Sequence, residues 1–434
     1  MYDKSLVTKE RLAELRVKRD AMRGERFAEA EKVIGKEGAD ALKYLYDIYG
    51  EGMYLWLARL WDPKIGGFYY SNSARDTEGL LPDVESTAQA LGFMETSGLI
   101  SSKGKTWPSA LPENMRAPAR EFAKGLQDPD GYFYHPQWGK DITVSRRGRD
   151  LGWGLSLVRN LGGKTNYPAP TDKKEENVNP TDLLPDHLKS IDNFRAYLAT
   201  QDLMHKSYSV GNLMQAQIGQ IKAAGKEFVD ELVSWYTVNQ NTELGLWQDE
   251  VCYHSTNGLM KVALAISAVD VKFPNAENAI KSAVEVILSD KPDPQITSFY
   301  NPWITIKLLL DNLTKFGEPQ KAERIRAEIL AKAPAMIRNT ADKVIAFRKE
   351  DGSFSYSPNG GTYRSQGALV ANPKANEGDV NGNGLASTGV IRNVCSALGI
   401  PVIPFFTVED SEFFFELIDA SYSSKKLYPK LESK

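Results

Sequence analysis

The segment CYHSTNG, from Cys252 to Gly258, holds the densest group of side chains that could move protons. Tyr253 and His254 are adjacent and Asn257 follows three residues after His254, so the last two share a face if a helix begins here. Imidazole exchanges protons near neutral pH, a phenol can act as an acid or as a base beside a cation, and an amide can hydrogen-bond a carboxylate. The segment predicts proton transfer on a substrate that carries a carboxyl group. The alternative is that Tyr253 is a packed aromatic at a helix start.

Two basic segments could bind an anionic group. SRRGRD supplies Arg146, Arg147 and Arg149, and GGTYRSQG supplies the neighbouring pair Tyr363 and Arg364. Guanidinium groups make bidentate contacts with carboxylate, sulfate or phosphate. The competing interpretation is that both segments are solvated loops.

Several aromatic residues lie in or beside the same segments and suit the apolar face of a sugar. Flat rings near polar groups commonly bind carbohydrates, and an imidazole at a rim can contact a ligand. The expected substrate-binding residues of this kind are His135, Trp138, Trp247 and Trp303. These rings could equally fill the interior of the fold.

Paired carboxylates offer a competing chemistry. Asp83 with Glu85, or Asp249 with Glu250, could supply the acid and base of a glycoside hydrolase. Adjacent acidic residues are common in loops, and Asp83 could simply cap a helix.

Helices must position these side chains, because apolar residues recur at helical spacing in nearly every long segment. The periodicity predicts helices over residues 41–60, 84–97, 114–127, 148–160, 186–202, 207–238, 255–269, 275–289, 299–315, 318–348, 384–398 and 409–421. Strand-like alternation is confined to short pieces such as Gly67–Tyr70 and Ser353–Tyr356. The sequence therefore predicts an all-α fold with a few small hairpins.

A recurring unit runs through the chain: a polar turn, a Gly followed by an aromatic, a loop, and a polar pair that opens an apolar helix. The copies are Trp61–Met94, Leu126–Val158, Gly245–Ile266 and Asp351–Gly361 with its continuation to Gly399. The glycine would allow a tight turn after an outer helix, and the Ser or Thr would hydrogen-bond within the first turn of the next helix.

The string GGF followed by PDVESTAQAL resembles the repeat of the α/α-toroid superfamily, which includes terpenoid cyclases, protein prenyltransferases and complement-type thioester domains, with toroidal polysaccharide lyases as architectural relatives. The resemblance implies an (α/α) toroid, or an incomplete toroid, of about six helical hairpins whose inner helices form a ring. It places the toroid at residues 38–400, a helical extension at 1–37 and another at 401–434. Within the toroid, the Pro, Asn and charge content at about residues 163–185 predicts an exposed loop or insertion. Toroidal lyases use Asn, His, Tyr and Arg side chains to neutralise a uronate and abstract its α-proton, which implies that role for the residues above.

Other members of that superfamily fit less well. The chain has no Asp-x-Asp-Asp cluster of the cyclase type, no Asp-x-Cys zinc pair and no thioester string, so neither a metal nor a cofactor is predicted. A formal charge of -3 argues against nucleic acid as a partner. Cys252 and Cys395 are expected to be free thiols, and the absence of a secretory signal and of long apolar runs predicts a cytoplasmic protein without a membrane partner.

The sequence thus favours a carbohydrate-active enzyme, a lyase that cleaves uronate-containing oligosaccharides by β-elimination. Tyr253 or Tyr363 would accept the proton, while His254, Asn257 and an arginine stabilise the enolate. The alternatives are a glycoside hydrolase, an isoprenoid-type toroid enzyme and a toroid that binds a ligand without turnover. The substrate would be an oligosaccharide or small molecule, with an anionic one favoured, and the oligomeric state stays open.

Overall fold

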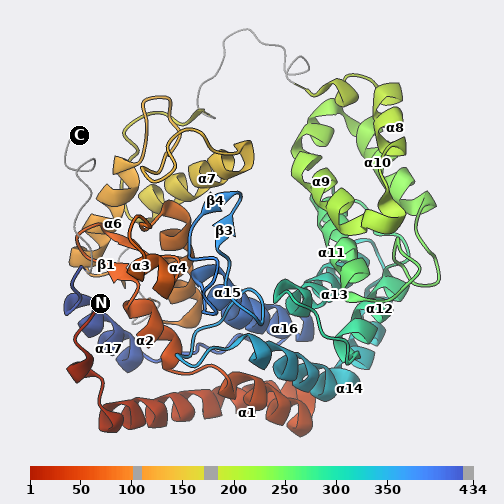
Figure 1. Ribbon diagram of the computed structural model, residues 1–434. Coiled ribbons are helices and arrows are strands. Elements are labelled where there is room, and N and C mark those ends of the chain that lie inside the picture. The colour runs from red at the N-terminus through yellow and green to blue at the C-terminus, as the bar shows by residue number, and fades with distance from the viewer. Residues whose placement is uncertain (101–109, 171–183, 424–434) are drawn as a thin grey trace.

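The computed structural model describes residues 1–100, 110–170 and 184–423, and helices make up most of this part (Figure 1). The α-helices are α1 Lys9–Asp47, α2 Gly52–Ala58, α3 Asn72–Asp76, α4 Val84–Ser97, α6 Glu113–Gly125, α7 Val144–Asn160, α8 Ile191–Ala199, α9 Leu203–Ala224, α10 Lys226–Val238, α11 Tyr253–Ala268, α12 Ala276–Leu288, α13 Thr297–Lys315, α14 Pro319–Val344, α15 Val380–Gly384, α16 Val390–Leu398 and α17 Val408–Asp419. Two antiparallel hairpins complete the fold: β1 Trp61–Asp62 pairs with β2 Gly67–Phe68, and β3 Arg364–Ser365 pairs with β4 Ala368–Leu369.

The helical periodicity of the sequence located most of these elements. The segment 84–97 is α4, and a π-helical turn at Leu385–Gly389 joins α15 to α16 over the predicted 384–398. The single helix expected over 207–238 is divided at Gly225, whose φ of 128° ends α9 before α10 begins. Glycine allows this backbone conformation without the steric cost that a Cβ would add.

The four Gly-aromatic units form the same kind of turn. A short backbone bridge closes each one, with the pairs Trp61↔Phe68, Gln127↔Phe133, Asn241↔Leu246 and Arg348↔Phe354. The glycine within each turn has positive φ: 82° at Gly66, 92° at Gly131, 67° at Gly245 and 85° at Gly352. The four units that recur in the sequence therefore also share one turn structure.

Each of these glycines also lies against the backbone of another segment. A Cβ at Gly66 would lie 2.3 Å from the Pro118 carbonyl oxygen in α6, and one at Gly245 would lie 2.2 Å from the Ala279 nitrogen in α12. At Gly352 it would lie 2.6 Å from the Cα of Gly52, where α2 begins. The turns thus place neighbouring units in contact, and only glycine fits at these positions.

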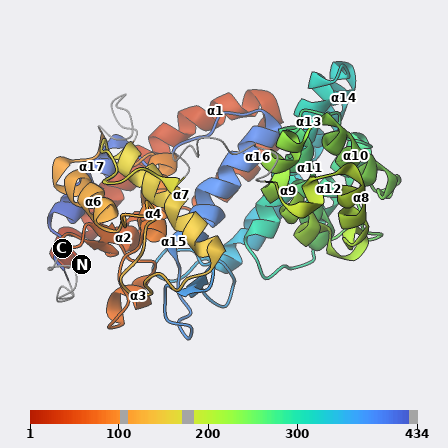
Figure 2. The ribbon, with the colours of Figure 1, turned by 90° about the horizontal axis from the view of Figure 1, so that it is seen from above.

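The helices that follow the turns pack side by side in one row, which α9 and α13 complete. The packed neighbours, in spatial order, are α7, α4, α15 with α16, α13, α11 and α9. A second set lies outside this row, with α6 against α7, α12 and α14 against α13, and α10 against α9. The two ends of the row, α7 and α9, stand apart in Figures 1 and 2.

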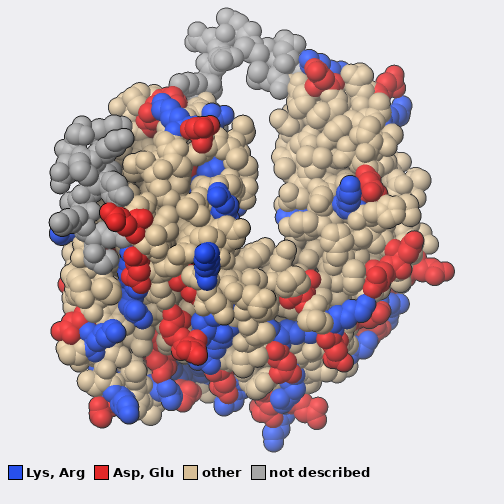
Figure 3. Space-filling view, viewed as in Figure 1, with Lys and Arg blue, Asp and Glu red and all other residues tan. Residues whose placement is uncertain are grey.

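The space between the ends of the row is an open groove between two lobes, visible in the space-filling view (Figure 3). The first lobe contains α2 to α7 and α17, the second contains α8 to α14, and α15 and α16 lie between them. The inner helices α7 and α9 face each other across the groove.

The long helix α1 runs beneath both lobes (Figure 1). It packs along α14 of the second lobe, and Arg11 forms a bidentate ion pair with Glu416 of α17 in the first. The expected boundary at residue 37 falls within α1, close to its one non-helical residue, Gly35. Most of the loop expected at about 163–185, and the end of the C-terminal extension, lie outside the described residues.

No helix in residues 1–100, 110–170 or 184–423 combines the length and apolar character that crossing a bilayer would require.

Candidate functional site

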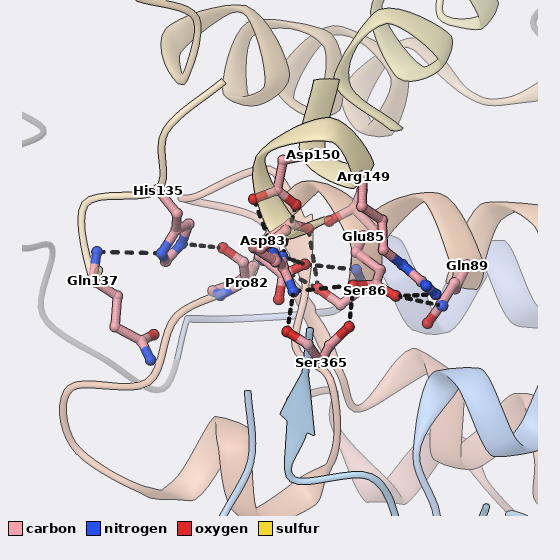
Figure 4. Close-up of polar contacts among 12 residues, drawn as sticks. Pro82, Asp83, Glu85, Ser86, Gln89, His135, Gln137, Arg149, Asp150 and Ser365 are labelled. Carbon is pink, nitrogen blue, oxygen red and sulfur yellow. Dashed lines mark hydrogen bonds and ion pairs between the residues drawn. The ribbon is translucent and has the colours of Figure 1, made fainter. Parts of the chain in front are cut away.

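A buried group of charged side chains joins α4, α7 and β3 on the wall of the first lobe (Figure 4). Arg146, which is fully buried, lies at its centre. Its guanidinium contacts Glu85 at 3.0 Å, Asp150 at 2.8 Å and Asp83 at 3.4 Å. Arg149 approaches Glu85 from the solvent side, at 2.7 Å. We call these five residues the ion cluster.

Local structure explains why the ion cluster forms. Asp83 is the N-cap of α4 and accepts a hydrogen bond from the Ser86 backbone at 2.8 Å, so its carboxylate is fixed at the helix start. Arg146 lies in the first turn of α7 and reaches Asp150 one turn later. Ser365 of β3 donates to Glu85 at 2.6 Å, which ties the hairpin to the cluster.

The ion cluster contains three carboxylates and two guanidinium groups. The pKa of Asp150 is raised to about 7, because burial, with help from Asp83 and Glu85, outweighs the opposing effect of Arg146. For Arg146, burial lowers the pKa, but the surrounding carboxylates outweigh burial and raise it overall. One proton held by the cluster would balance its charge, and Asp150 is the carboxyl group that takes it most readily.

The burial of this cluster bears on the hydrolase hypothesis. Asp83 and Glu85 are 1% and 0% exposed and are already paired with arginines, so neither side chain is free to reach a substrate in this arrangement. The other candidate pair is exposed but also partnered, since Asp249 accepts from Asn241 at 2.9 Å and Glu250 pairs with Lys291. In each pair, both carboxylates thus already have partners within the protein.

His135 and Trp138 flank the ion cluster. The Arg146 guanidinium lies 4.8 Å from the centre of the Trp138 ring, which stacks in turn against His135. His135 Nε2 lies 2.8 Å from the Pro82 carbonyl, and burial lowers the pKa of the imidazole to about 4, so His135 is neutral at ordinary pH. Trp138 also lines a shallow pocket of about 430 Å³ with Gln137 and Leu369. Of the two, only Trp138 is placed to meet a ligand.

The expected substrate contacts Trp247 and Trp303 lie in the interior. They are 1% and 0% exposed, and their indole N–H groups donate to the Tyr236 carbonyl and to Thr340. Both rings therefore fill the interior of the second lobe and are not available to a substrate. The sequence had left this interior position open as an alternative.

Tyr253 is also removed from solvent. It is 5% exposed, packs edge-on against Phe299, and accepts a hydrogen bond from Lys343 at 2.6 Å. Burial raises the pKa of Tyr253 and lowers that of Lys343 to about 8. Lys343 also donates to the Ser289 carbonyl, next to the end of α12, so the pair joins helix ends within the second lobe. Tyr253 is not placed as the proton acceptor of a groove site.

His254 and Asn257 lie in the first turns of α11, as the spacing predicted. His254 is exposed, while Asn257 bridges to α13 through Ser298 at 3.1 Å and Asn301 at 3.0 Å. One turn further, Lys261 continues the same face of the helix. Its ammonium lies 5.7 Å from the ring centre of Tyr208 in α9, and burial lowers its pKa. Lys261 has no carboxylate partner among the described residues.

Three tyrosines outside the sequence-based site lie near one another, and one of them, Tyr208, lies against Lys261. Tyr208 from α9, Tyr300 from α13 and Tyr356 from the loop after the fourth turn form what we call the tyrosine cluster. Burial raises the pKa of Tyr300, the neighbouring Tyr356 and Tyr208 raise it further, and Arg392 of α16 lowers it. The cluster and its two cations therefore come from four helices of the inner row and one adjoining loop.

The remaining candidates lie on the first lobe. Tyr363 is 43% exposed, and exposed Arg364 donates to the Gly367 carbonyl within the β3–β4 hairpin. Arg147 lies 5.2 Å from the ring centre of Tyr132. The structure therefore separates these residues, with the ion cluster, from Asn257 and His254 on the other lobe.

Sequence reasoning missed Tyr208, Tyr356, Lys261 and Arg392 because no motif marks them. Lys261 alone carried a usable signal, since it falls four residues after Asn257 on a predicted helix. The others are brought together only by the packing of distant helices.

The described part of the chain contains no group of three or more His, Cys, Asp or Glu side chains arranged to hold a metal ion. Comparison with known proteins finds no matching family model, curated protein or solved structure.

Proposed function

We propose that this chain is an incomplete α/α toroid that cleaves uronate-containing oligosaccharides by β-elimination in the groove between its lobes. The observation that carries the proposal is the meeting of α9, α11, α13 and α16, where Tyr208 lies against Lys261 and where the charges of Tyr208, Tyr356 and Arg392 act on Tyr300. Phenol, guanidinium and amine groups together can supply the functions this reaction needs.

The repeat supports the toroid. Four closely similar glycine turns each precede a helix of the inner row, and outer helices alternate with inner ones along most of the chain. The separation of α7 from α9 leaves the ring open, and an open ring admits a polymer from the side.

β-Elimination at a uronate needs three groups. A cation must neutralise the carboxylate so that the adjacent C–H bond becomes acidic, a base must take that proton, and an acid must protonate the departing oxygen. We assign the first role to Arg392, which can bind a carboxylate with two N–H donors. Burial lowers the pKa of Lys261, so more of its amine is neutral at a given pH, and we assign it the second role.

Tyr300 takes the third role. Its raised pKa keeps the phenol protonated, so it can donate to the glycosidic oxygen as the carbon–oxygen bond breaks. The electrons of the C–H bond form the new double bond, and the leaving sugar departs as an alcohol. Lys261 then releases its proton to solvent, and Tyr300 takes up a proton from solvent.

The test is incubation of the protein with oligosaccharides of galacturonate, glucuronate, mannuronate and guluronate. A lyase generates an unsaturated uronate that absorbs in the ultraviolet, and the proposal expects this absorbance with at least one substrate. New reducing ends without the absorbance would identify a hydrolase and overturn the proposal. Binding without either product would identify a toroid that holds a ligand without turnover and would overturn it as well.

A further inference from the structure

A second cavity, of about 710 Å³, lies between α1, the start of α2 and the turn at residues 348–352. Its lining shares no residue with the tyrosine cluster or the ion cluster. Two arginines of α1, Arg19 and Arg23, contribute to the lining, although their side chains are largely enclosed, at 2% and 6% exposure.

Arg23 has no carboxylate within ion-pair distance among the described residues. Its Nη2 donates to the carbonyls of Tyr49 at 3.2 Å and Phe405 at 2.8 Å, while Nε and Nη1 donate to no described residue. Burial lowers the pKa of Arg23 and the neighbouring guanidinium of Arg19 lowers it further, while the more distant carboxylates of Asp20 and Asp410 raise it. A buried cation with no carboxylate in direct contact is costly, so this arrangement favours an anion that can reach it.

Arg19 is only partly paired. Its Nη2 contacts Glu51 at 2.6 Å, but Nη1 donates no hydrogen bond and lies 3.6 Å from Asp410. The cavity as a whole holds acidic and basic residues in balance, and most of them are paired or exposed, as with Lys43 and Asp47. The unmatched charge is therefore local to Arg23.

We propose that this cavity binds a small oxyanion, a carboxylate or phosphate group, through Arg23. A planar or tetrahedral oxyanion can accept two hydrogen bonds from one guanidinium and also neutralises its charge. A water molecule cannot neutralise that charge. A purely structural role would instead have Arg23 only fasten α1 to the carbonyls of Tyr49 and Phe405.

Gly24, which also lines the cavity, provides a test that leaves both arginines in place. A Cβ at this exposed helical position would meet nothing within 4 Å, so larger residues fit. Gly24→Glu places a carboxylate at the cavity and competes with an anion, whereas Gly24→Gln adds the same bulk without charge. Both substitutions favour the helix over glycine.

The measurement is the thermal midpoint of unfolding in inorganic phosphate and, separately, in malonate, at constant ionic strength set with chloride. For wild type and Gly24→Gln, an anion at ten times its Kd should raise Tm by roughly 1–2 °C. Gly24→Glu should bind the same anion about tenfold or more weakly. Stabilisation by phosphate alone indicates a phosphorylated ligand, and stabilisation by malonate alone a carboxylate ligand.

Absence of an anion-specific rise in wild type would overturn the proposal. An equal rise in wild type and both variants would also overturn it, because the anion would then act away from the cavity. Arg23→Met provides a direct check, since an apolar residue removes the unpaired charge, and this variant should lose the response to both anions even if its stability changes.

Discussion

Asp150 shows how burial decides the behaviour of one side chain in this protein. It lies 2.8 Å from a guanidinium, a contact that would ordinarily hold a carboxyl group ionised. Removal from water, and the nearby Asp83 and Glu85, outweigh that contact and raise its pKa to about 7. Sequence inspection singled out the residues of this segment as ligands for an anion, whereas Arg146 already has its anions inside the protein.

The raised pKa of Asp150 predicts a specific pH dependence of stability. The pKa of Asp150 in the folded protein exceeds its ordinary value of about 4. Its stabilising contribution to the free energy of unfolding is therefore fully present below pH 4 and is lost as pH rises to 7. Asp150→Asn keeps an uncharged group there at all pH values. Its free energy of unfolding relative to wild type should therefore increase by roughly 1–3 kcal/mol between pH 4 and 7 and level off above that.

Urea unfolding of both proteins at several pH values measures this difference directly. Asp379, whose pKa burial raises to about 6, is present in both proteins and cancels in the comparison. The exposed Asp141→Asn serves as the control and should show a flat difference. If the difference in free energy of unfolding between Asp150→Asn and wild type does not change with pH, the raised pKa of Asp150 is contradicted.

At the scale of elements, the sequence predicted the helices well because periodicity is a local property. The glycine turns were also predictable, since a Gly before an aromatic recurs with the same polar neighbours and the structure gives each such glycine a positive φ. Two features were not predictable: the full length of α1, whose dense charges obscure an apolar stripe, and the distance between α7 and α9. Both depend on contacts between segments far apart in the chain.

The turn glycines should tolerate no side chain. Gly245→Ala forces a Cβ to within 2.2 Å of the Ala279 backbone in a left-handed conformation, and we expect it to lower the free energy of unfolding by about 2–4 kcal/mol. The matched control is Gly219→Ala on the exposed face of α9, where an added Cβ meets nothing within 4 Å. That change should stabilise the protein by about 0.5–1 kcal/mol.

Denaturant unfolding of the two alanine variants gives both values. If Gly219→Ala destabilises the protein as much as Gly245→Ala, the special role of the turn is contradicted.

At the scale of the whole molecule, the arrangement of the inner row explains why the proposed site differs from the sequence-based one. The row curves around a groove, so residues on α9, α11, α13 and α16 become neighbours although they span almost two hundred positions of the sequence. His254 and Asn257 lie close together because they share one helix. Tyr253, next to them in sequence, points into the lobe because adjacent residues of a helix lie on different faces.

We propose that the tyrosine cluster, and not Tyr253, serves the chemistry of the groove. The most direct measurement is the rate of unsaturated product formation by Tyr300→Phe and by Tyr253→Phe on the substrate found in the uronate panel, with the folding of each variant verified by its circular dichroism. The account predicts that kcat falls by about 10²-fold or more for Tyr300→Phe, since a proton donor is lost, and stays within about threefold for Tyr253→Phe. A large loss in Tyr253→Phe with Tyr300→Phe unaffected would contradict it.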